Sequence, residues 1–220
     1  MQIIASRNLA AILITALLSC AVMATAGRAQ QQEERAAVKT TDGLLFIWNR
    51  PDMSFSISIK GNEVKPLDAG GNVFLTVDGK VLQIQSLPIS NFAPDARKDK
   101  LSDDAILAAH RDWEAGFIEN ELLKKKISVK SSSERLPNGM RALLWQYDFP
   151  QGFENSDVKT QMYVTVVAKD YMILLNGVAN STFSEATIQN FLRTTMSTLK
   201  ISSERIDIEK EQEKIRKSQP

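Results

Sequence analysis

QMYVTVVAKDYMILLNGV, residues 161–178, is the stretch of this chain that decides its fold. Two apolar segments flank the polar dipeptide Lys169-Asp170, and their β-branched and aromatic residues favour strands. The short polar break predicts that the segments 161–168 and 171–178 pair as an antiparallel hairpin. Because a strand that is buried on both faces is apolar almost throughout, we expect this hairpin at the centre of a sheet.

The residues directly after this hairpin predict a helix. Thr182-Phe183-Ser184-Glu185 fits a capping box, whereas Ser184 as the N-cap would instead bring Phe183 onto Ile188. The expected inner face of the helix consists of Ile188, Phe191, Leu192, Thr195 and Leu199.

Two more strands are expected before the hairpin, over residues 127–135 and 140–149, with Pro137-Asn138-Gly139 as the turn between them. In the second of these strands the side chains alternate between the two faces of the sheet. Met140, Ala142 and Leu144 point to one face, and Leu143, Trp145 and Tyr147 point to the other.

Another helix is expected before these strands. Ser102 is a suitable N-cap, with Asp103 and Asp104 in the first turn and the lysines 124–126 in the last turn. Its expected buried stripe consists of Ile106, Trp113 and Phe117, widened by Leu107, Ile118 and Leu122.

The first part of the chain also has the pattern of strands. Residues 44–48 form a short apolar run, and apolar residues alternate with serines over 54–59. The segments 73–77 and 81–85 flank Asp78-Gly79, a dipeptide that two-residue hairpin turns favour.

The order of elements is therefore strands, a helix, antiparallel strands and a second helix, without an internal repeat. This order predicts the α+β class: an antiparallel β-sheet with helices packed against it, in a single domain over residues 43–202. Residues 30–42 are expected to be a flexible leader. Residues 203–220 are a charged C-terminal tail, either a helical extension or a disordered segment.

Residues 1–29 have the features of a secretory signal peptide. A positive charge precedes the uncharged residues 8–27, and small residues follow at Ala24-Thr25-Ala26 and Gly27-Arg28-Ala29. These features predict a secreted or periplasmic protein of the cell envelope. Two alternatives stay open: an uncleaved signal would anchor the chain in a membrane, and Leu17-Leu18-Ser19-Cys20 looks like a lipobox whose cysteine carries a lipid.

Composition narrows the chemistry of the mature chain. Cys20 is the only cysteine, so cleavage after residue 29 excludes disulfides, thiol nucleophiles and thiolate metal sites. Removing Arg7 and Arg28 leaves 25 of the 27 basic residues against 26 acidic ones, which gives no electrostatic reason to expect nucleic acid as a partner. A membrane is expected as a partner only if Cys20 is lipidated or the signal is uncleaved.

Few residues of the chain suggest catalysis. His110 is the only histidine, and its place on the apolar stripe of the first helix predicts a hydrogen-bonded core residue. No G-x-S-x-G motif presents a serine for a catalytic triad. The acidic residues between 95 and 104 lack the spacing and the glycine of a calcium-binding loop. We therefore expect no catalytic residue, no metal ion and no cofactor.

Aromatic residues are the best candidates for a binding surface, because they are enriched where partners pack. The candidate surface consists of Trp145, Tyr147, Phe149 and Phe153, and Trp48 is a further aromatic candidate. The alternative is that these side chains belong to the core or flank the sheet.

The chain resembles the PsbP-like superfamily of secreted and lipid-anchored proteins, the PsbP/DcrB type. The elements that carry the resemblance are the strand 55–59, the helix 104–123, the hairpin 162–178 and the helix 183–199 after it. The resemblance lies in the order of elements, without a diagnostic motif. It implies an α/β/α sandwich that acts as a binding or accessory module. The expected function is a non-catalytic envelope module that binds an envelope protein or a small apolar ligand. The alternative is a secreted hydrolase that uses scattered Ser, Asp or Glu groups.

Overall fold

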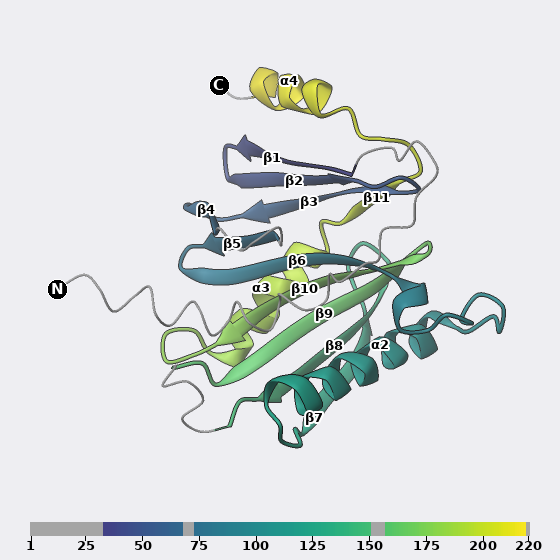
Figure 1. Ribbon diagram of the computed structural model, residues 1–220. Coiled ribbons are helices and arrows are strands. Elements are labelled where there is room, and N and C mark those ends of the chain that lie inside the picture. Colours follow the sequence, from purple (N-terminus) through teal and green to yellow (C-terminus); the bar gives the residue numbers. More distant parts are fainter. Residues whose placement is uncertain (1–32, 68–72, 151–156, 219–220) are drawn as a thin grey trace.

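A computed structural model describes residues 33–67, 73–150 and 157–218 of the chain (Figure 1). The expected signal peptide with Cys20 lies outside the described residues, and so does Phe153 of the candidate binding surface.

The larger sheet confirms the predicted central hairpin. Its strands are all antiparallel to their neighbours, and the order across the sheet is β4-β5-β6-β10-β9-β8-β7, so β10 is the middle strand of seven. The bounds are β4 (Val64–Leu67), β5 (Val73–Val77), β6 (Lys80–Pro88), β7 (Val129–Arg135), β8 (Arg141–Asp148), β9 (Thr160–Ala168) and β10 (Tyr171–Ala179). Every residue of β10 is buried.

The remaining strands form a second, four-stranded sheet in the order β1-β2-β3-β11. Its strands are β1 (Glu34–Thr40), β2 (Gly43–Asn49), β3 (Ser54–Lys60) and β11 (Lys200–Ser202). The α+β class is therefore confirmed, but the structure has two antiparallel sheets where the sequence predicts one. The alternation in β3 predicts a strand with one wet face, and it contains no signal for which neighbours that strand pairs with.

The prediction of a flexible leader over residues 30–42 is wrong for the part that forms β1. This strand pairs with β2 along its whole length, from Glu34 opposite Asn49 to Thr40 opposite Gly43. Its backbone pairing needs little apolar surface, and Val38 alone of its residues is buried. A polar, alanine-containing edge strand of this kind has the composition of a linker, which is why composition misses it.

Two helices lie on opposite faces of the larger sheet (Figure 1). Helix α2 (Asp103–Phe117), extended by the π-helical turn η2 (Ile118–Leu122), packs against β8 and β9. Helix α3 (Glu185–Met196) packs on the other face against β9 and β10, and also against β3 of the smaller sheet. The core between the two sheets therefore also includes α3. A short 3₁₀ turn, η1 (Ile89–Asn91), follows β6.

Both predicted N-caps are confirmed. The Ser102 hydroxyl accepts a hydrogen bond from the Ala105 backbone N–H at 3.3 Å, and the Ser184 hydroxyl accepts one from the Thr187 N–H at 3.2 Å. The hairpin turn at Asp78-Gly79 is confirmed as well, because both residues have the positive φ angles, 48° and 80°, that such a turn requires.

The predicted buried stripe of α2 is wrong at Trp113, which is 37% exposed. Glu114 takes the place toward the sheet instead and is buried. Helical periodicity locates the buried face of a helix only to within about one residue. Where an apolar residue stands beside an acidic one, the prediction places the apolar residue on the buried face. The lysines 124–126 also lie beyond the helical residues, which end at Leu122.

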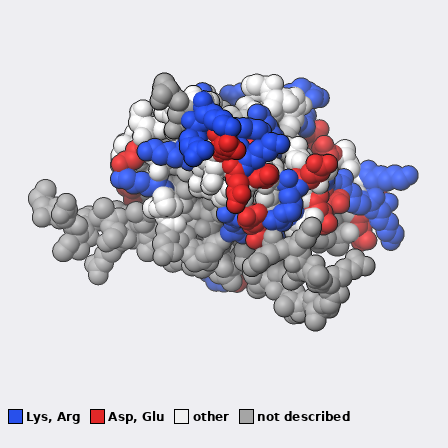
Figure 2. Space-filling model, turned by 90° about the horizontal axis from the view of Figure 1, so that it is seen from above, with Lys and Arg blue, Asp and Glu red and all other residues white. Residues whose placement is uncertain are grey.

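The charged tail contains the helix α4 (Ile208–Ser218), which has no buried residue. This confirms the helical one of the two alternatives for these residues. Ion pairs run along α4, and Lys and Arg side chains lie beside Asp and Glu side chains over the face seen from above (Figure 2). None of the helices within the described ranges is long and apolar enough to cross a membrane.

Replacing Gly177 of β10 should destabilise the fold, because a Cβ there would lie 2.9 Å from the Val81 carbonyl oxygen and 3.3 Å from Ile188. We expect Gly177→Ala to lower the free energy of unfolding by about 1–3 kcal/mol, as overpacked core positions do. The control is Gly116→Ala in α2, where no atom lies within 4 Å of the new Cβ. That variant should be more stable by roughly 0.5–1 kcal/mol, because alanine favours the helix. Urea unfolding measures both, and a neutral Gly177→Ala would contradict the close packing.

Candidate functional site

The aromatic residues predicted as a binding surface lie mainly in the core under α2. Trp145 and Tyr147 are only 2% and 1% exposed, and the Trp145 ring stacks on Tyr163 with the ring centroids 3.8 Å apart. Phe149 is partly buried, with its ring 5.2 Å from that of Tyr147. Trp145 and Tyr147 therefore belong to the core, as the alternative interpretation has it, although Trp145 is also among the residues that line the groove described below. Trp48 is buried in the other core cluster.

A cluster of polar groups is buried with these aromatic rings. His110 and Glu114 reach it from α2, one helical turn apart, and both are buried. Among the described residues, neither ring nitrogen of His110 has a hydrogen-bond partner, and the same holds for Trp145 Nε1. The prediction of a hydrogen-bonded core histidine is thus right about burial and wrong about hydrogen bonding. The edge of the Phe92 ring packs on His110 instead.

Burial controls the protonation of this cluster. It lowers the pKa of His110 to about 4 and raises the pKa of the Glu114 carboxyl to about 7. Burial also raises the pKa of the Tyr147 and Tyr163 hydroxyls, and the negative charge of Glu114 adds to both shifts. At neutral pH His110 is therefore neutral. Because it is closed off from solvent beneath α2, it has no route to a substrate in this structure.

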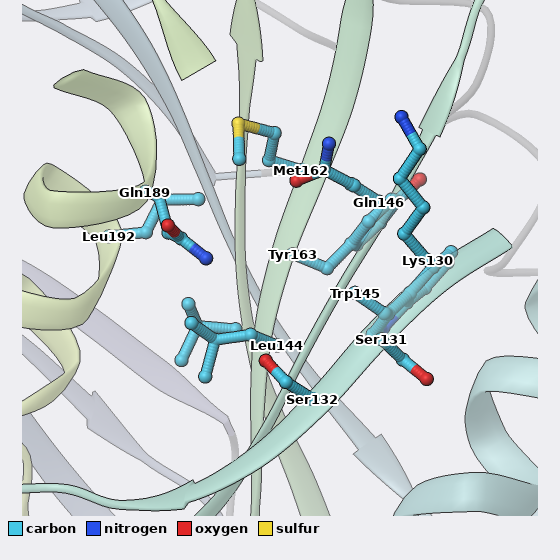
Figure 3. A pocket seen from close by; sticks show the side chains of 11 residues that line it. Lys130, Ser131, Ser132, Leu144, Trp145, Gln146, Met162, Tyr163, Gln189 and Leu192 are labelled. Carbon is cyan, nitrogen blue, oxygen red and sulfur yellow. The ribbon is translucent and has the colours of Figure 1, made fainter. Parts of the chain in front are cut away.

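An open groove lies on the opposite face of the sheet, beside α3 (Figure 3). Its volume is about 140 Å³. Leu144, Met162 and Val164 form an apolar floor from β8 and β9. Gln189 and Leu192 of α3 form one wall, and Lys130 and Ser132 of β7 line the other side.

Two polar contacts tie α3 to the sheet next to this groove. The Glu185 carboxylate accepts hydrogen bonds from Gln146 Nε2 at 2.7 Å and from the Thr160 hydroxyl at 3.0 Å. Two turns further along the helix, Arg193 Nε donates to the Glu134 carboxylate at 2.6 Å. Gln189 lies midway between these contacts in the helix, so both walls of the groove are held in place.

The groove is suited to noncovalent recognition. Its lining offers apolar side chains, amides and hydroxyls, and among the described lining residues Lys130 alone is charged and pairs with Asp148 at 3.2 Å. Among the described residues, no group of three or more His, Cys, Asp or Glu side chains could hold a metal ion.

Sequence reasoning misses the groove residues for a specific reason. Ser132 and Gln189 are 57 positions apart and carry no motif, and only the packing of α3 on the sheet brings them together. Glu114 is missed because a lone glutamate within a helix is normally solvated. No model of a known protein family matches this chain, and no curated protein matches it either.

The buried pair His110 and Glu114 predicts opposite slopes of stability against pH, which oppose each other where the two titration ranges overlap, from pH 4.5 to 6.5. Between pH 4.5 and 7 the folded state binds more protons at Glu114 than the unfolded chain, so its contribution to stability falls as pH rises. Between pH 6.5 and 4 the unfolded chain binds more protons at His110, so stability falls as pH drops.

Single substitutions should separate the two slopes. Glu114→Gln should leave stability that falls from pH 6.5 toward 4, and at pH 8 it should be more stable than the native chain by about 1–3 kcal/mol. His110→Gln should leave stability that falls from pH 4.5 to 7. Urea unfolding at intervals from pH 4 to 8 measures both. If the two variants keep the pH profile of the native chain, the buried groups do not titrate as described.

Proposed function

We propose that this domain is a non-catalytic binding module that holds an extended segment of a protein partner along β7, with one side chain of that segment in the groove beside α3. The observation that supports the proposal most strongly is the position of the groove. It lies directly against β7, the strand at the edge of the larger sheet.

The edge strand β7 is suited to pairing with another strand. An edge strand presents unpaired N–H and C=O groups, which added strands use in peptide recognition. The middle of β7 consists of the exposed serines 131–133. The other edge of the larger sheet, β4, is four residues long and contains Pro66, which lacks an N–H. The edge strand β1 has contacts with α4 and an ion pair from Glu34 to Arg205.

The size of the groove favours a protein partner over a small ligand at this position. Sites for drug-sized molecules have volumes of about 300–1,000 Å³. The groove has about 140 Å³, which suits a single side chain. Its apolar floor, and the amides and hydroxyl of Gln146, Gln189 and Ser132 that lie beside Lys130 on its rim, favour an apolar side chain or one that ends in an amide.

We propose that the protein acts in the cell envelope, because residues 1–29 have the pattern of a secretory signal. Attachment to a membrane is part of this proposal only through lipidated Cys20 or an uncleaved signal. Acidic and basic side chains are interspersed over the face in Figure 2, which is no footprint for nucleic acid. Helices on both faces of the larger sheet fit an α/β/α sandwich, and on this ground we propose a relationship to the PsbP-like superfamily.

The test uses peptides selected by phage display against the purified protein. Ser132→Phe fills the groove from β7. We expect it to weaken the binding of a selected peptide at least tenfold, which corresponds to about 1.4 kcal/mol of binding free energy. Ser133→Phe is the matched control, because this neighbouring side chain points to the other face of the same strand. Isothermal titration calorimetry measures the affinities, and hydrogen exchange should show new protection of β7 amides in the complex.

Three outcomes would contradict the proposal. The first is a selection that yields no peptide, the second is equal weakening of peptide binding by both phenylalanine variants, and the third is new protection on another element. Each of these would mean that β7 and its groove do not hold the partner.

The hydrolase alternative makes a different prediction for His110. A binding module with His110 buried under α2 should lose stability in His110→Gln and keep its affinity for the selected peptide within about twofold, since distant sites are independent. Calorimetry on the folded variant checks this, with circular dichroism as the control for folding. A folded His110→Gln that no longer binds would show that the cluster under α2 belongs to the functional site.

A further inference from the structure

A second hollow lies on the other flank of α3, between this helix, β3 and the hairpin β5–β6. Its volume is about 290 Å³, twice that of the groove beside β7 and close to the lower end of small-molecule sites at about 300 Å³. The described residues that line it include two lysines and no carboxylate. They are Ser58, Lys60, Lys80, Thr187, Asn190, Phe191, Thr194, Thr195 and Thr198. We call it the lysine hollow.

Lys80 is held at the hollow by aromatic rings. Its ammonium nitrogen lies 5.2 Å from the centroid of the Phe183 ring and 5.5 Å from that of Phe191. Gly79 brings the tip of the hairpin close to Phe183, since a Cβ on Gly79 would lie 3.3 Å from that ring. Within the described part of the chain, Lys80 forms no ion pair with a carboxylate. Its charge is therefore available to a ligand.

Lys60 adds a second positive group on the β3 side. Its ammonium pairs with Asp42 at 3.1 Å, and this contact lowers the pKa of the Asp42 carboxyl. Asp42 does not line the hollow, so the sign of the charge that faces the hollow is positive.

The floor of the hollow is more apolar than its threonine content suggests. The Thr198 hydroxyl accepts a hydrogen bond from the Ser58 N–H at 2.9 Å, and its single hydrogen is shared between the carbonyl oxygens of Ser58 and Thr195, at 2.9 and 2.7 Å. With its hydroxyl bonded to the backbone, Thr198 can offer the hollow its methyl group. The Phe191 ring and the methylene stems of the lysines supply further apolar surface.

We propose that the lysine hollow binds a small amphipathic anion, with a carboxylate near Lys80 and an apolar body against Phe191 and Thr198. The charge requires an anion, and the apolar floor requires more than an inorganic ion. This inference is independent of the proposed partner at β7, because the two sites use opposite flanks of α3 and share none of the residues that line them.

Octanoate and its uncharged analogue 1-octanol are the probes for the full mature protein. We expect octanoate to bind, with chemical-shift changes at Lys80, Phe191 and Thr198 in ¹H–¹⁵N spectra, and 1-octanol to bind at least fivefold more weakly. Lys80→Met keeps the apolar stem and removes the charge. It should therefore weaken the binding of octanoate about fivefold and leave the binding of 1-octanol unchanged. Lys98→Met, which removes an exposed lysine from a distant loop, is the control.

Thr194→Trp should abolish the binding of both probes, because this exposed α3 residue lines the hollow and the larger ring fills it. The proposal is overturned if octanoate does not bind or its shifts fall on other elements. It is also overturned if 1-octanol binds as tightly, or if Lys80→Met and Lys98→Met behave alike. Ser132→Phe should keep octanoate binding, so a failure at β7 and a failure here are told apart.

Discussion

The burial of β10 on both faces is the constraint on which the rest of the structure depends. Met172 and Leu174 point into the core beneath α2, while Ile173 and Leu175 point into the core that contains α3. Each such side chain adds roughly 1.5–3 kcal/mol to the free energy of unfolding, but only when it is removed from water. The chain must therefore supply cover on both faces of this strand, and the layers of the fold follow from that requirement.

The grooves result from how that cover is built. A helix is about 10–12 Å wide and neighbouring strands are about 4.8 Å apart, so one helix covers about two strands. Helix α3 accordingly packs on β9 and β10, and part of the rest of that face packs against the smaller sheet. The flank toward β7 and the flank toward β3 are left as hollows. Hollows on both sides of α3 thus follow from covering a wide sheet with a single helix.

Features with a local cause could be predicted from the sequence. The central hairpin, the caps at Ser102 and Ser184, and the turn at Asp78-Gly79 each depend on residues a few positions apart, and the structure confirms them. What could not be predicted depends on distant pairing. The split into two sheets, the ordered strand β1 and the meeting of Ser132 with Gln189 have no local signal, because the partner residues decide them.

The two faces of the larger sheet differ in how their polar groups are bonded. Under α2, burial keeps His110 neutral, and its ring nitrogens and Trp145 Nε1 have no hydrogen-bond partner among the described residues, which costs stability. Helix α3, by contrast, is anchored by Ile188, Leu192 and Met196, which are fully buried, and by its two polar contacts to β7, β8 and β9. These contacts describe one arrangement of α3, whereas coupling between two sites requires an element with two. The two hollows beside α3 therefore share one helix as their common wall, and His110 and Glu114 under α2 are not among the described residues that line either hollow.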